Sequence, residues 1–458
     1  MIRSFVSLLF FAALALAEPA DWVIAARYAV TMDPARRVID DGAVAVRGER
    51  ILAVGPRTAI LKAYQPKQRL DRPRAILLPG LVNAHAHAPM SLLRGIADDL
   101  KLQEWLEKYI FPAEAKNVTP EFVRWGTRLA CLEMALSGVT TYADMYYFEE
   151  VVAEATKEAG LRGVLGETII NFPVPDARTP AEGLKRAEAF IRRFRNDPLI
   201  VPAVAPHAVY TNTEESLRQA RALANRYDVP LLTHLSETKA ENEQVRAKWG
   251  MTPAALLDQW GIFGGKTLVA HAVWVDEADR RILRERGAGV AHCPSSNTKL
   301  ASGVAPVLAM LGAGLAVGLG TDGPAGSNND FNLFEEMDLA AKMQKVFSGD
   351  PRALPARQAL EMATILGART VSLDKQIGSL EPGKRADLIT VAIDQPHAVP
   401  LYDVYSQLVY ALKAADVRDV MVNGRLILRE RQSLMLNPAA ILAKAEEFRA
   451  KISASLPQ

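Results

Sequence analysis

The feature that most constrains the fold is a short apolar segment followed by an amphipathic one, a pair that recurs along the middle of the chain. A short apolar run bounded by turn residues is typical of a buried parallel strand, and the amphipathic segment after it is typical of a helix that covers the sheet. Eight candidate strands lie at residues 76–87, 139–145, 161–168, 199–207, 230–235, 267–273, 289–293 and 315–322. Eight such units predict an α/β fold, a (β/α)8 TIM barrel, over residues 77–376.

Polar residues at the expected helix starts agree with this arrangement. Thr119-Pro120-Glu121 offers an N-cap residue, then proline and an acidic side chain, the order that favours a first helical turn. Thr213 and Asp276 are each followed by an acidic residue, so helices are predicted to begin there as well.

The two flanks of the barrel differ from it in pattern. Residues 18–76 contain short strand-like runs separated by glycine-containing turns. Residues 377–458 contain similar runs at 386–391 and 420–428, followed by an Ala/Glu/Lys-rich stretch that predicts a helix at 438–452. We expect both flanks to fold together into one small, discontinuous β-sandwich domain.

The N-terminus predicts a signal peptide over residues 1–17. Arg3 is followed by an apolar run at residues 5–16, and Ala15-Leu16-Ala17 supplies the small residues of a cleavage site. The run is too short to span a bilayer comfortably, so we expect no stable membrane anchor. Cleavage near Ala17 would give an exported, periplasmic protein, whereas a misassigned start codon would leave the protein in the cytoplasm.

Charge and cysteine content narrow the class of partner. The 458-residue chain has a formal net charge of +2, which gives no argument for nucleic acid and leaves a small-molecule substrate as the expected partner. Its two cysteines, Cys131 and Cys293, exclude a disulfide framework but leave their own pairing open. The sequence also leaves open whether the chain forms a homo-oligomer.

Histidines are concentrated where a barrel builds its active site. The chain has 7 histidines, and all but His397 lie at or near the carboxyl end of a predicted strand. One histidine so placed is more often a structural residue, but this concentration predicts a functional site at the carboxyl-terminal rim of the barrel. The six rim histidines are His85, His87, His207, His234, His271 and His292.

Two of these histidines, together with an aspartate, suggest a metal site. His85 and His87 are two residues apart on one strand, so alternation puts both side chains on the inner face, where they can share a divalent cation. Asp322, at the end of the last predicted strand, can supply a carboxylate, although an Asp before a glycine also fits a helix N-cap.

A third histidine is paired with an acid. Glu237 follows His234 by three residues, which places a carboxyl group just beyond the end of its strand. Such a group can move a proton between a water and a substrate nitrogen. The alternative is a solvated loop residue.

Several motifs together resemble the amidohydrolase superfamily, in particular its S-adenosylhomocysteine/5′-methylthioadenosine deaminase group, which is related to the triazine hydrolases and chlorohydrolases. The likeness runs from Asp21 to the C-terminal helix. The motifs are Pro79-Gly80-Leu81-Val82-Asn83-Ala84-His85-Ala86-His87, Arg94-Gly95-Ile96-Ala97-Asp98-Asp99-Leu100, Phe111-Pro112-Ala113-Glu114, Ala205-Pro206-His207, His234-Leu235-Ser236-Glu237-Thr238, His292-Cys293-Pro294-Ser295-Ser296-Asn297, Gly320-Thr321-Asp322-Gly323 and residues 378–388.

The resemblance implies a role for each site residue. It implies one Zn²⁺ per chain, or another divalent metal such as Fe²⁺, since no barrel-strand lysine stands where a bridging carbamate would be needed. The metal ligands would be His85, His87, His234 and Asp322. The catalytic residues would be Glu237 as proton shuttle, His271 orienting the water, and Asp322 accepting its proton. The substrate-binding residues would be Glu114 on the ribose hydroxyls, His207, Trp105 in the purine pocket, and Arg178 on a substrate carboxylate.

The implied activity is hydrolytic deamination of an adenine nucleoside, namely 5′-methylthioadenosine, S-adenosylhomocysteine or adenosine, to the inosine analogue and ammonia. Two features of the chain differ from the deaminase group. Val209 stands at a position where the group usually has proline, and export is unusual for an enzyme of nucleoside salvage. One alternative is a hydrolase of another amino- or chloro-substituted heterocycle: an s-triazine, a pterin or a free base. A non-catalytic scaffold of the same fold is another, and Glu114 could instead cap a helix.

Overall fold

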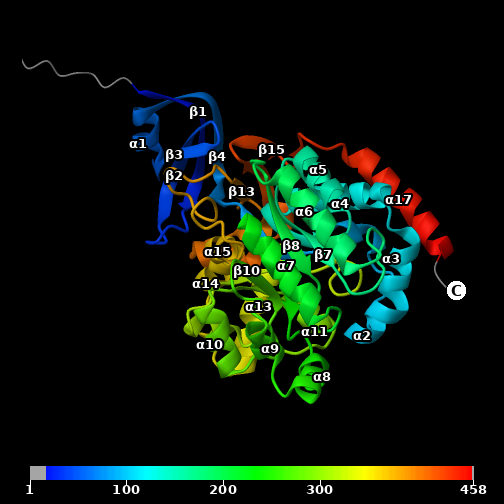
Figure 1. The fold of residues 1–458 in the computed structure, drawn as a ribbon. Helices are drawn as coiled ribbons and strands as arrows, with labels where there is room; N and C mark the ends of the chain where they lie inside the picture. The colour runs from blue at the N-terminus through cyan, green and yellow to red at the C-terminus, as the bar shows by residue number, and fades with distance from the viewer. Residues whose placement is uncertain (1–16, 456–458) are drawn as a thin grey trace, which may run out of the picture.

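The structure is a computed structural model that describes residues 17–455 (Figure 1), so the predicted signal peptide lies almost wholly outside the described residues. Its strands form two sheets of eight strands each. One sheet is the barrel, and the other belongs to a small domain built from both ends of the chain (Figure 1). Within the described part of the chain, no helix is both long and apolar enough to cross a membrane.

The predicted eight-stranded barrel is confirmed. Its strands are parallel and follow one another in chain order around the sheet. A parallel bridge between Ala86 and Asp322 joins the last strand to the first, and the Asp322 N–H donates to the His85 carbonyl over 2.9 Å. The strands are β5 (Leu81–Ala86), β6 (Val139–Tyr146), β7 (Arg162–Ile169), β8 (Ile200–Pro206), β9 (Leu231–Leu235), β10 (Thr267–His271), β11 (Gly289–His292) and β12 (Val317–Leu319).

The helices begin where their caps predict. Thr119 accepts from the Phe122 N–H at the start of α4, and Thr213 and Asp276 form capping boxes at the starts of α7 and α10. Around the barrel lie α4 (Pro120–Leu136), α5 (Glu149–Ala159), α6 (Pro180–Phe194), α7 (Glu214–Tyr227), α8 (Lys239–Trp249), α9 (Pro253–Gln259), α10 (Glu277–Glu285), α11 (Pro294–Lys299), α12 (Val307–Gly312), α13 (Leu333–Ser348), α14 (Ala356–Ala363) and α15 (Ile365–Thr370).

The first predicted strand, residues 76–87, is wrong as a single element. It is split between β4 (Tyr64–Pro79) of the small domain and β5 of the barrel, with Gly80 at the junction. The Gly80 N–H donates to the Asp387 carbonyl, whereas the next N–H donates to Gly138 beside the barrel. A side chain at Gly80 would overlap Thr140, so glycine is needed where the chain passes from one sheet to the other.

The small domain confirms that both flanks fold together. Its mixed sheet has the order β16-β15-β14-β13-β4-β1-β2-β3, and β4 from the first flank pairs antiparallel with β13 from the second. Alternate residues of β1 face opposite sides: Ile24 packs in the main core of the domain, and Val23 packs under α1 with Ile60. The remaining elements are β1 (Glu18–Val30), β2 (Val38–Arg47), β3 (Arg50–Pro56), α1 (Arg57–Ala63), β13 (Leu388–Ala392), β14 (Val417–Val422), β15 (Arg425–Arg429) and β16 (Gln432–Ser433).

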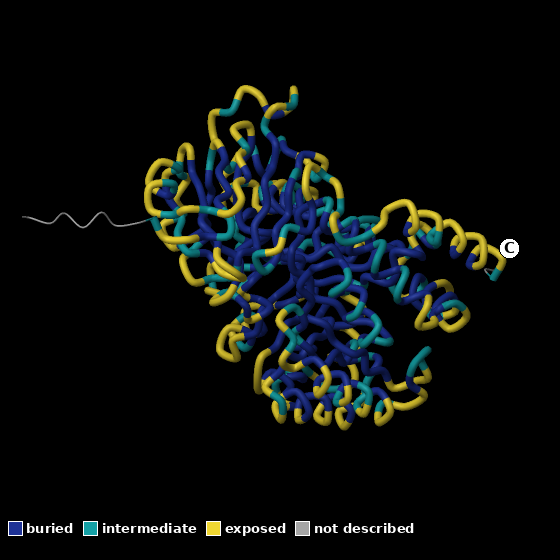
Figure 2. Tube along the Cα trace, turned by 90° about the horizontal axis from the view of Figure 1, so that it is seen from above, coloured by how far each residue is buried: buried dark blue, intermediate teal, exposed yellow. Residues whose placement is uncertain are grey.

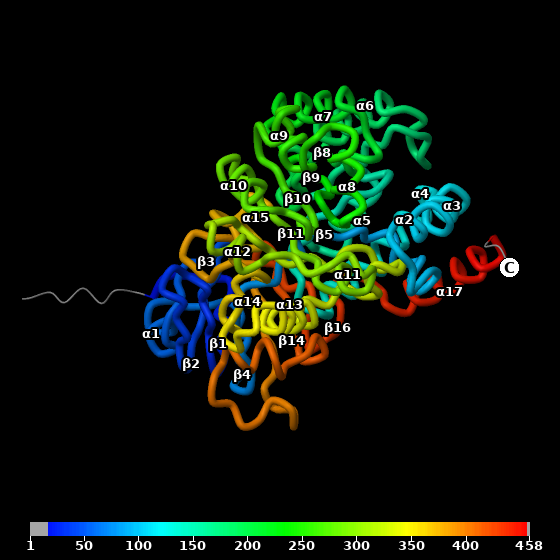
Figure 3. Tube along the Cα trace, turned by 90° about the horizontal axis from the view of Figure 1, so that it is seen from below, coloured from blue at the N-terminus to red at the C-terminus, as the bar shows by residue number. Residues whose placement is uncertain are grey.

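The run predicted at residues 420–428 is a hairpin. β14 and β15 pair antiparallel across Asn423-Gly424, whose φ angles are 52° and 77°. Positive φ at both central residues is the requirement of a type I′ turn, which Asn-Gly satisfies. The predicted C-terminal helix is α17 (Pro438–Ser455), which packs against α4 and α3 at the edge of the barrel (Figure 3).

Burial follows this architecture. Figure 2 shows buried chain through the barrel strands and the small sheet, with exposed chain on the surrounding helices and loops. Cys131 and Cys293 are both buried and free, so they do not form a disulfide bond with each other.

One helical segment crosses the carboxyl-terminal rim of the barrel. It consists of α2 (Leu102–Trp105), the π-helical turn η2 (Leu106–Ile110) and α3 (Phe111–Asn117).

Candidate active site

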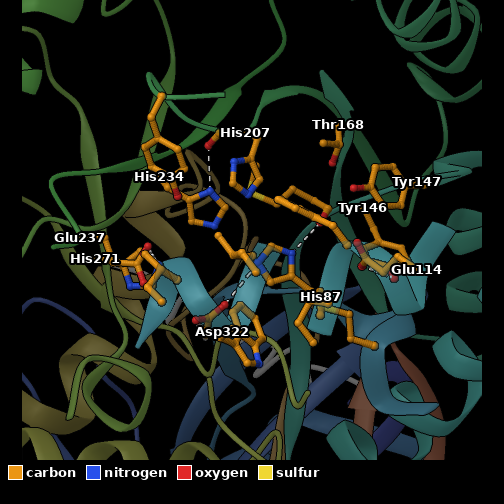
Figure 4. Close-up of a pocket in the computed structure, with 18 residues that line it drawn as sticks. His87, Glu114, Tyr146, Tyr147, Thr168, His207, His234, Glu237, His271 and Asp322 are labelled. Atoms are coloured by element: carbon orange, nitrogen blue, oxygen red, sulfur yellow. Dashed lines mark hydrogen bonds and ion pairs between the residues drawn. The ribbon is translucent and has the colours of Figure 1, made fainter. Parts of the chain in front are cut away.

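A pocket opens at the carboxyl-terminal ends of the barrel strands. Its wall includes most of the residues singled out in the sequence (Figure 4). His85 is buried beside the rings of His87 and His234. The lining residues are His87, Met90, Leu102, Trp105, Leu106, Ile110, Phe111, Glu114, Met145, Tyr146, Tyr147, Thr168, His207, Tyr210, His234, Glu237, His271 and Asp322.

Barrel closure brings three of the predicted ligands together. His85 is on β5, His87 directly follows it, and their ring centroids are 4.8 Å apart. Asp322 Oδ1 lies 3.4 Å from His85 Nε2 and 3.2 Å from His87 Nε2. The N-cap alternative for Asp322 is wrong, because α13 begins only at Leu333 and is capped by Asn332.

His234, on β9, faces the same point. Its ring centroid is 5.0 Å from that of His85 and 5.5 Å from that of His87. His234 Nδ1 is bonded to the His207 carbonyl over 2.8 Å, and His87 Nδ1 is bonded to the Met145 carbonyl over 2.7 Å. A carbonyl can only accept, so each Nδ1 carries a proton, and Nε2 is the ring nitrogen left to face the centre.

These donors fit a divalent metal ion. His85 Nε2 is buried and has no hydrogen-bond partner in the described chain. The potential ligand atoms of His85, His87 and Asp322 lie within 4.8 Å of one another. Burial lowers the pKa of His85 to about 4, so its imidazole is neutral, the form that binds metal. Neutral imidazoles beside a carboxylate are the donor set that Zn²⁺ prefers.

Ionisation of Asp322 and His87 is linked. Burial alone would raise the pKa of Asp322, but its contacts with the His85 and His87 rings hold it well below its usual range. Burial alone would lower the pKa of His87, but the same carboxylate raises it to about 9. The proton that these two groups share competes with a metal ion, so metal affinity at this site depends on pH.

Glu237 and His271 stand together at one side of this cluster (Figure 4). Glu237 Oε2 is 3.9 Å from His271 Nε2, and burial raises the pKa of the Glu237 carboxyl. His271 Nδ1 is bonded to Asn297 Oδ1 on α11 over 3.0 Å. The loop alternative for Glu237 is wrong in its burial, since the residue is 3% exposed and lines the pocket.

Several residues whose roles were not predicted from the sequence support these groups. Glu241 accepts from the N–H groups of Ser236 and Glu237, at 3.0 and 2.8 Å, and so fixes the backbone that carries Glu237. Ser296 donates to Asp322 Oδ2 over 2.6 Å. Ser296 and Asn297 belong to a motif already noted in the sequence, which was the available signal for both.

Glu114 lies on the opposite side of the cluster, beside Tyr146 and Tyr147 (Figure 4). Its alternative role as a helix cap is wrong, because α3 continues directly from η2 and its carboxylate is buried in the pocket wall. The Tyr146 hydroxyl donates to Glu114 Oε1 over 2.6 Å. Burial raises the pKa of Glu114 to about 7.

The other predicted substrate residues differ in placement. Trp105 lines the pocket and donates its indole N–H to the Ala325 carbonyl over 2.9 Å. His207 also lines it, with Nδ1 bonded to Thr211 over 3.0 Å. Arg178 does not reach the pocket: it is exposed, and its backbone N–H donates to Glu182 on α6. The structure therefore does not bring Arg178 to the site.

The geometry gives the pocket two chemically distinct ends. One end holds the histidine and aspartate donors with Glu237 and His271, a set suited to activating a water and moving protons. The other end holds a buried carboxylate, Glu114, suited to accepting hydrogen bonds. Each of the four predicted ligands is present, which a non-catalytic scaffold has no need to keep.

The chain is similar to known proteins over most of its length. A model of the amidohydrolase family matches residues 76–427, and a bacterial imidazolonepropionase-like composite domain matches residues 42–64 in the small domain. A 5-methylthioadenosine/S-adenosylhomocysteine deaminase of Syntrophobacter fumaroxidans is 46% identical over 93% of this chain and 97% of its own length.

Solved structures show the same architecture. An adenosine deaminase from Xanthomonas campestris with bound zinc is 41% identical, with a TM-score of 0.94 over 96% of this chain and 100% of its own. An atrazine chlorohydrolase from Arthrobacter aurescens TC1 complexed with zinc is 25% identical, with a TM-score of 0.85 over 93% of this chain and 100% of its own. With a family model that spans most of its length and a relative of this similarity, the chain belongs to the amidohydrolase family.

Proposed function

We propose that this protein is a metal-dependent hydrolytic deaminase of adenine nucleosides, such as adenosine and its 5′-thioether derivatives, giving the inosine form and ammonia. The observation that carries the proposal is the two-ended pocket, with metal-type donors and an acid at one end and the buried carboxylate of Glu114 at the other. The names of the similar proteins, a 5-methylthioadenosine/S-adenosylhomocysteine deaminase and an adenosine deaminase, support it.

In this proposal His85, His87, His234 and Asp322 hold one divalent ion, for which zinc in the Xanthomonas relative is the supporting precedent. The chemistry that such an ion supplies is a lowered pKa of its bound water, which provides hydroxide near neutral pH. Asp322 would accept a proton from the attacking water. Ser296 holds the other carboxylate oxygen of Asp322 and so fixes its direction.

Glu237 and His271 handle the protons of the substrate. Burial keeps the pKa of Glu237 raised, so its carboxyl can hold a proton and deliver it to the ring nitrogen beside the amino-bearing carbon. Protonation makes that carbon electrophilic. After water has added, the same carboxylate moves a proton from the new hydroxyl to the amino group, which leaves as ammonia. His271 orients the attacking water through Nε2, because Nδ1 is bonded to Asn297.

The rest of the pocket fits a nucleoside. One helical segment supplies an apolar wall that suits the faces of a purine and a thioether. The residues of this wall are Leu102, Trp105, Leu106, Ile110 and Phe111. Glu114 ends that wall with a carboxylate that can accept hydrogen bonds from both ribose hydroxyls. His207 stands between the two ends and can contact the base (Figure 4).

Glu114→Ala tests the nucleoside assignment. A hydrogen bond to a charged group contributes about 1.5–3 kcal/mol, so losing the ribose partner should raise KM for adenosine by more than about tenfold. Turnover of free adenine, to the extent that it occurs, should change little. The measurement is the KM of wild type and variant for adenosine, its 2′- and 3′-deoxy forms, and adenine. A wild type that treats adenosine and its deoxy forms alike would reject the ribose role of Glu114.

A further inference from the structure

Glu114 is held by a neighbour that the reaction does not otherwise use. The Tyr146 hydroxyl donates to Glu114 Oε1 over 2.6 Å, and both side chains are almost completely buried. Tyr147 lies beside the same carboxylate and, like Tyr146, lowers its pKa against the effect of burial. The carboxylate therefore has a fixed donor on one oxygen, and as part of the pocket lining it can accept further hydrogen bonds.

A carboxylate that is to accept two hydroxyls must be oriented before they arrive. A free glutamate side chain loses rotamer freedom when it is fixed, and this loss weakens binding unless the protein has already fixed it. We propose that Tyr146 is a positioning residue that sets Glu114 for ribose and thereby determines selectivity for ribonucleosides over deoxynucleosides. This inference rests on the proposed role of Glu114.

Tyr146 is itself held at the end of β6 by the loop that follows. Its N–H donates to Glu149 Oε1 over 2.8 Å, and the Phe148 N–H donates to Asp176 Oδ2 over 2.7 Å. Phe148 has a φ of 56°, a conformation that non-glycine residues rarely adopt and that persists only where neighbouring groups hold it. The loop is therefore fixed through backbone N–H groups rather than through the tyrosine side chains.

Behind this loop lies a cluster of buried carboxyl groups around Arg186. The Glu149 N–H donates to Glu167 Oε2 over 3.1 Å, and Arg186 Nε lies 3.0 Å from Glu167 and 3.2 Å from Asp176. The guanidinium also lies 5.2 Å from the centre of the Phe148 ring. Burial raises the pKa of Glu149 and of Glu167 well above their usual range. The negative charge of the cluster is therefore offset by protonation of these carboxyl groups and by the guanidinium of Arg186.

The cluster connects α6 to the pocket. Arg186 on α6 fixes Asp176 and Glu167, these fix residues 148 and 149, and the loop presents the Tyr146 hydroxyl to Glu114. Each link is a hydrogen bond or ion pair between buried or half-buried groups, which is the arrangement that keeps a side chain within a narrow range of positions. Tyr146 thus provides a preorganised partner for Glu114 rather than a mobile one.

Tyr146→Phe tests the proposal. We expect KM for adenosine to rise by about five- to tenfold with kcat changed less than about threefold, because a donor to a charged acceptor is lost while the hydrolytic end is untouched. KM for 2′,3′-dideoxyadenosine, which lacks both hydroxyls, should stay unchanged. Tyr402→Phe is the matched control, since Tyr402 is 93% exposed and distant from the pocket lining.

The double variant separates positioning from a structural role. In a Glu114→Ala background, Tyr146→Phe should add no further rise in KM, because the group that it positions is gone. Fully additive effects, or an equal loss with adenosine and the dideoxy form, would assign Tyr146 a structural role and overturn the proposal. If Glu114→Ala itself leaves the KM for adenosine unchanged, the ribose role of Glu114 fails. If Glu114→Ala acts and Tyr146→Phe does not, only the positioning role of Tyr146 fails.

Discussion

Asp322→Ala should lose the bound metal and lower deaminase turnover by well over a hundredfold, and His85→Ala should do the same. Even the outer partners of metal ligands are each worth about 10–100-fold in affinity or activity, and these two residues are proposed to be ligands themselves. Asp322 Oδ1 lies within 3.4 Å of the Nε2 atoms of both His85 and His87, so its removal takes a negative charge from the centre of the donor set.

The measurement is elemental metal content per chain, read beside turnover of adenosine. Asp40→Ala is the matched control: Asp40 is exposed on β2 of the small domain, where it pairs with Arg27, and its loss should leave metal and turnover unchanged. Full metal content with normal turnover in Asp322→Ala or His85→Ala would contradict the assignment of these residues as metal ligands.

Glu237→Gln should keep the metal and lower turnover by at least about a hundredfold, the usual worth of a positioned acid–base group. The amide preserves the shape of the side chain but can neither give a proton to the ring nitrogen nor receive one. The backbone N–H of Glu237, and not its side chain, donates to Glu241, so the substitution leaves this hydrogen bond intact.

Metal content and single-turnover rates distinguish this effect from loss of the metal. Glu243→Gln serves as the control, because Glu243 is an exposed residue of α8 and pairs there with Lys239. A loss of only a few-fold in Glu237→Gln would make Glu237 a mere lining residue and leave the proton shuttle unassigned.

Much of the barrel could be predicted because strand and helix signals are local. Each parallel strand is an apolar run, and each helix start has its own cap, as at Thr119 and Thr213. The prediction of a single strand over residues 76–87 was wrong because the break at Gly80 depends on residues distant in the sequence. The Thr140 side chain requires a glycine at position 80, and the Asp387 carbonyl accepts the Gly80 N–H. The continuous apolar run from Ile76 gives no local sign of either contact.

The site shows the same division. The metal-type donors could be predicted because parallel strands end at one rim, so position on the strand determines position in space. The partners of those donors could not be predicted, since Ser296 and Asn297 act through tertiary hydrogen bonds to Asp322 and His271. Arg178 was misplaced because it lies in the connection before α6, where no regular element fixes where the chain runs.

The central claim is tested most directly by ammonia release from a substrate panel with metal-loaded protein. The panel contains adenosine, 5′-methylthioadenosine, S-adenosylhomocysteine, adenine, a pterin and an s-triazine. The account predicts one ammonia per adenosine or 5′-methylthioadenosine consumed, with the inosine form as product, and far slower turnover of the free base, the pterin and the triazine. Turnover confined to the base, the pterin or the triazine, with no ammonia released from any adenine nucleoside, would contradict it.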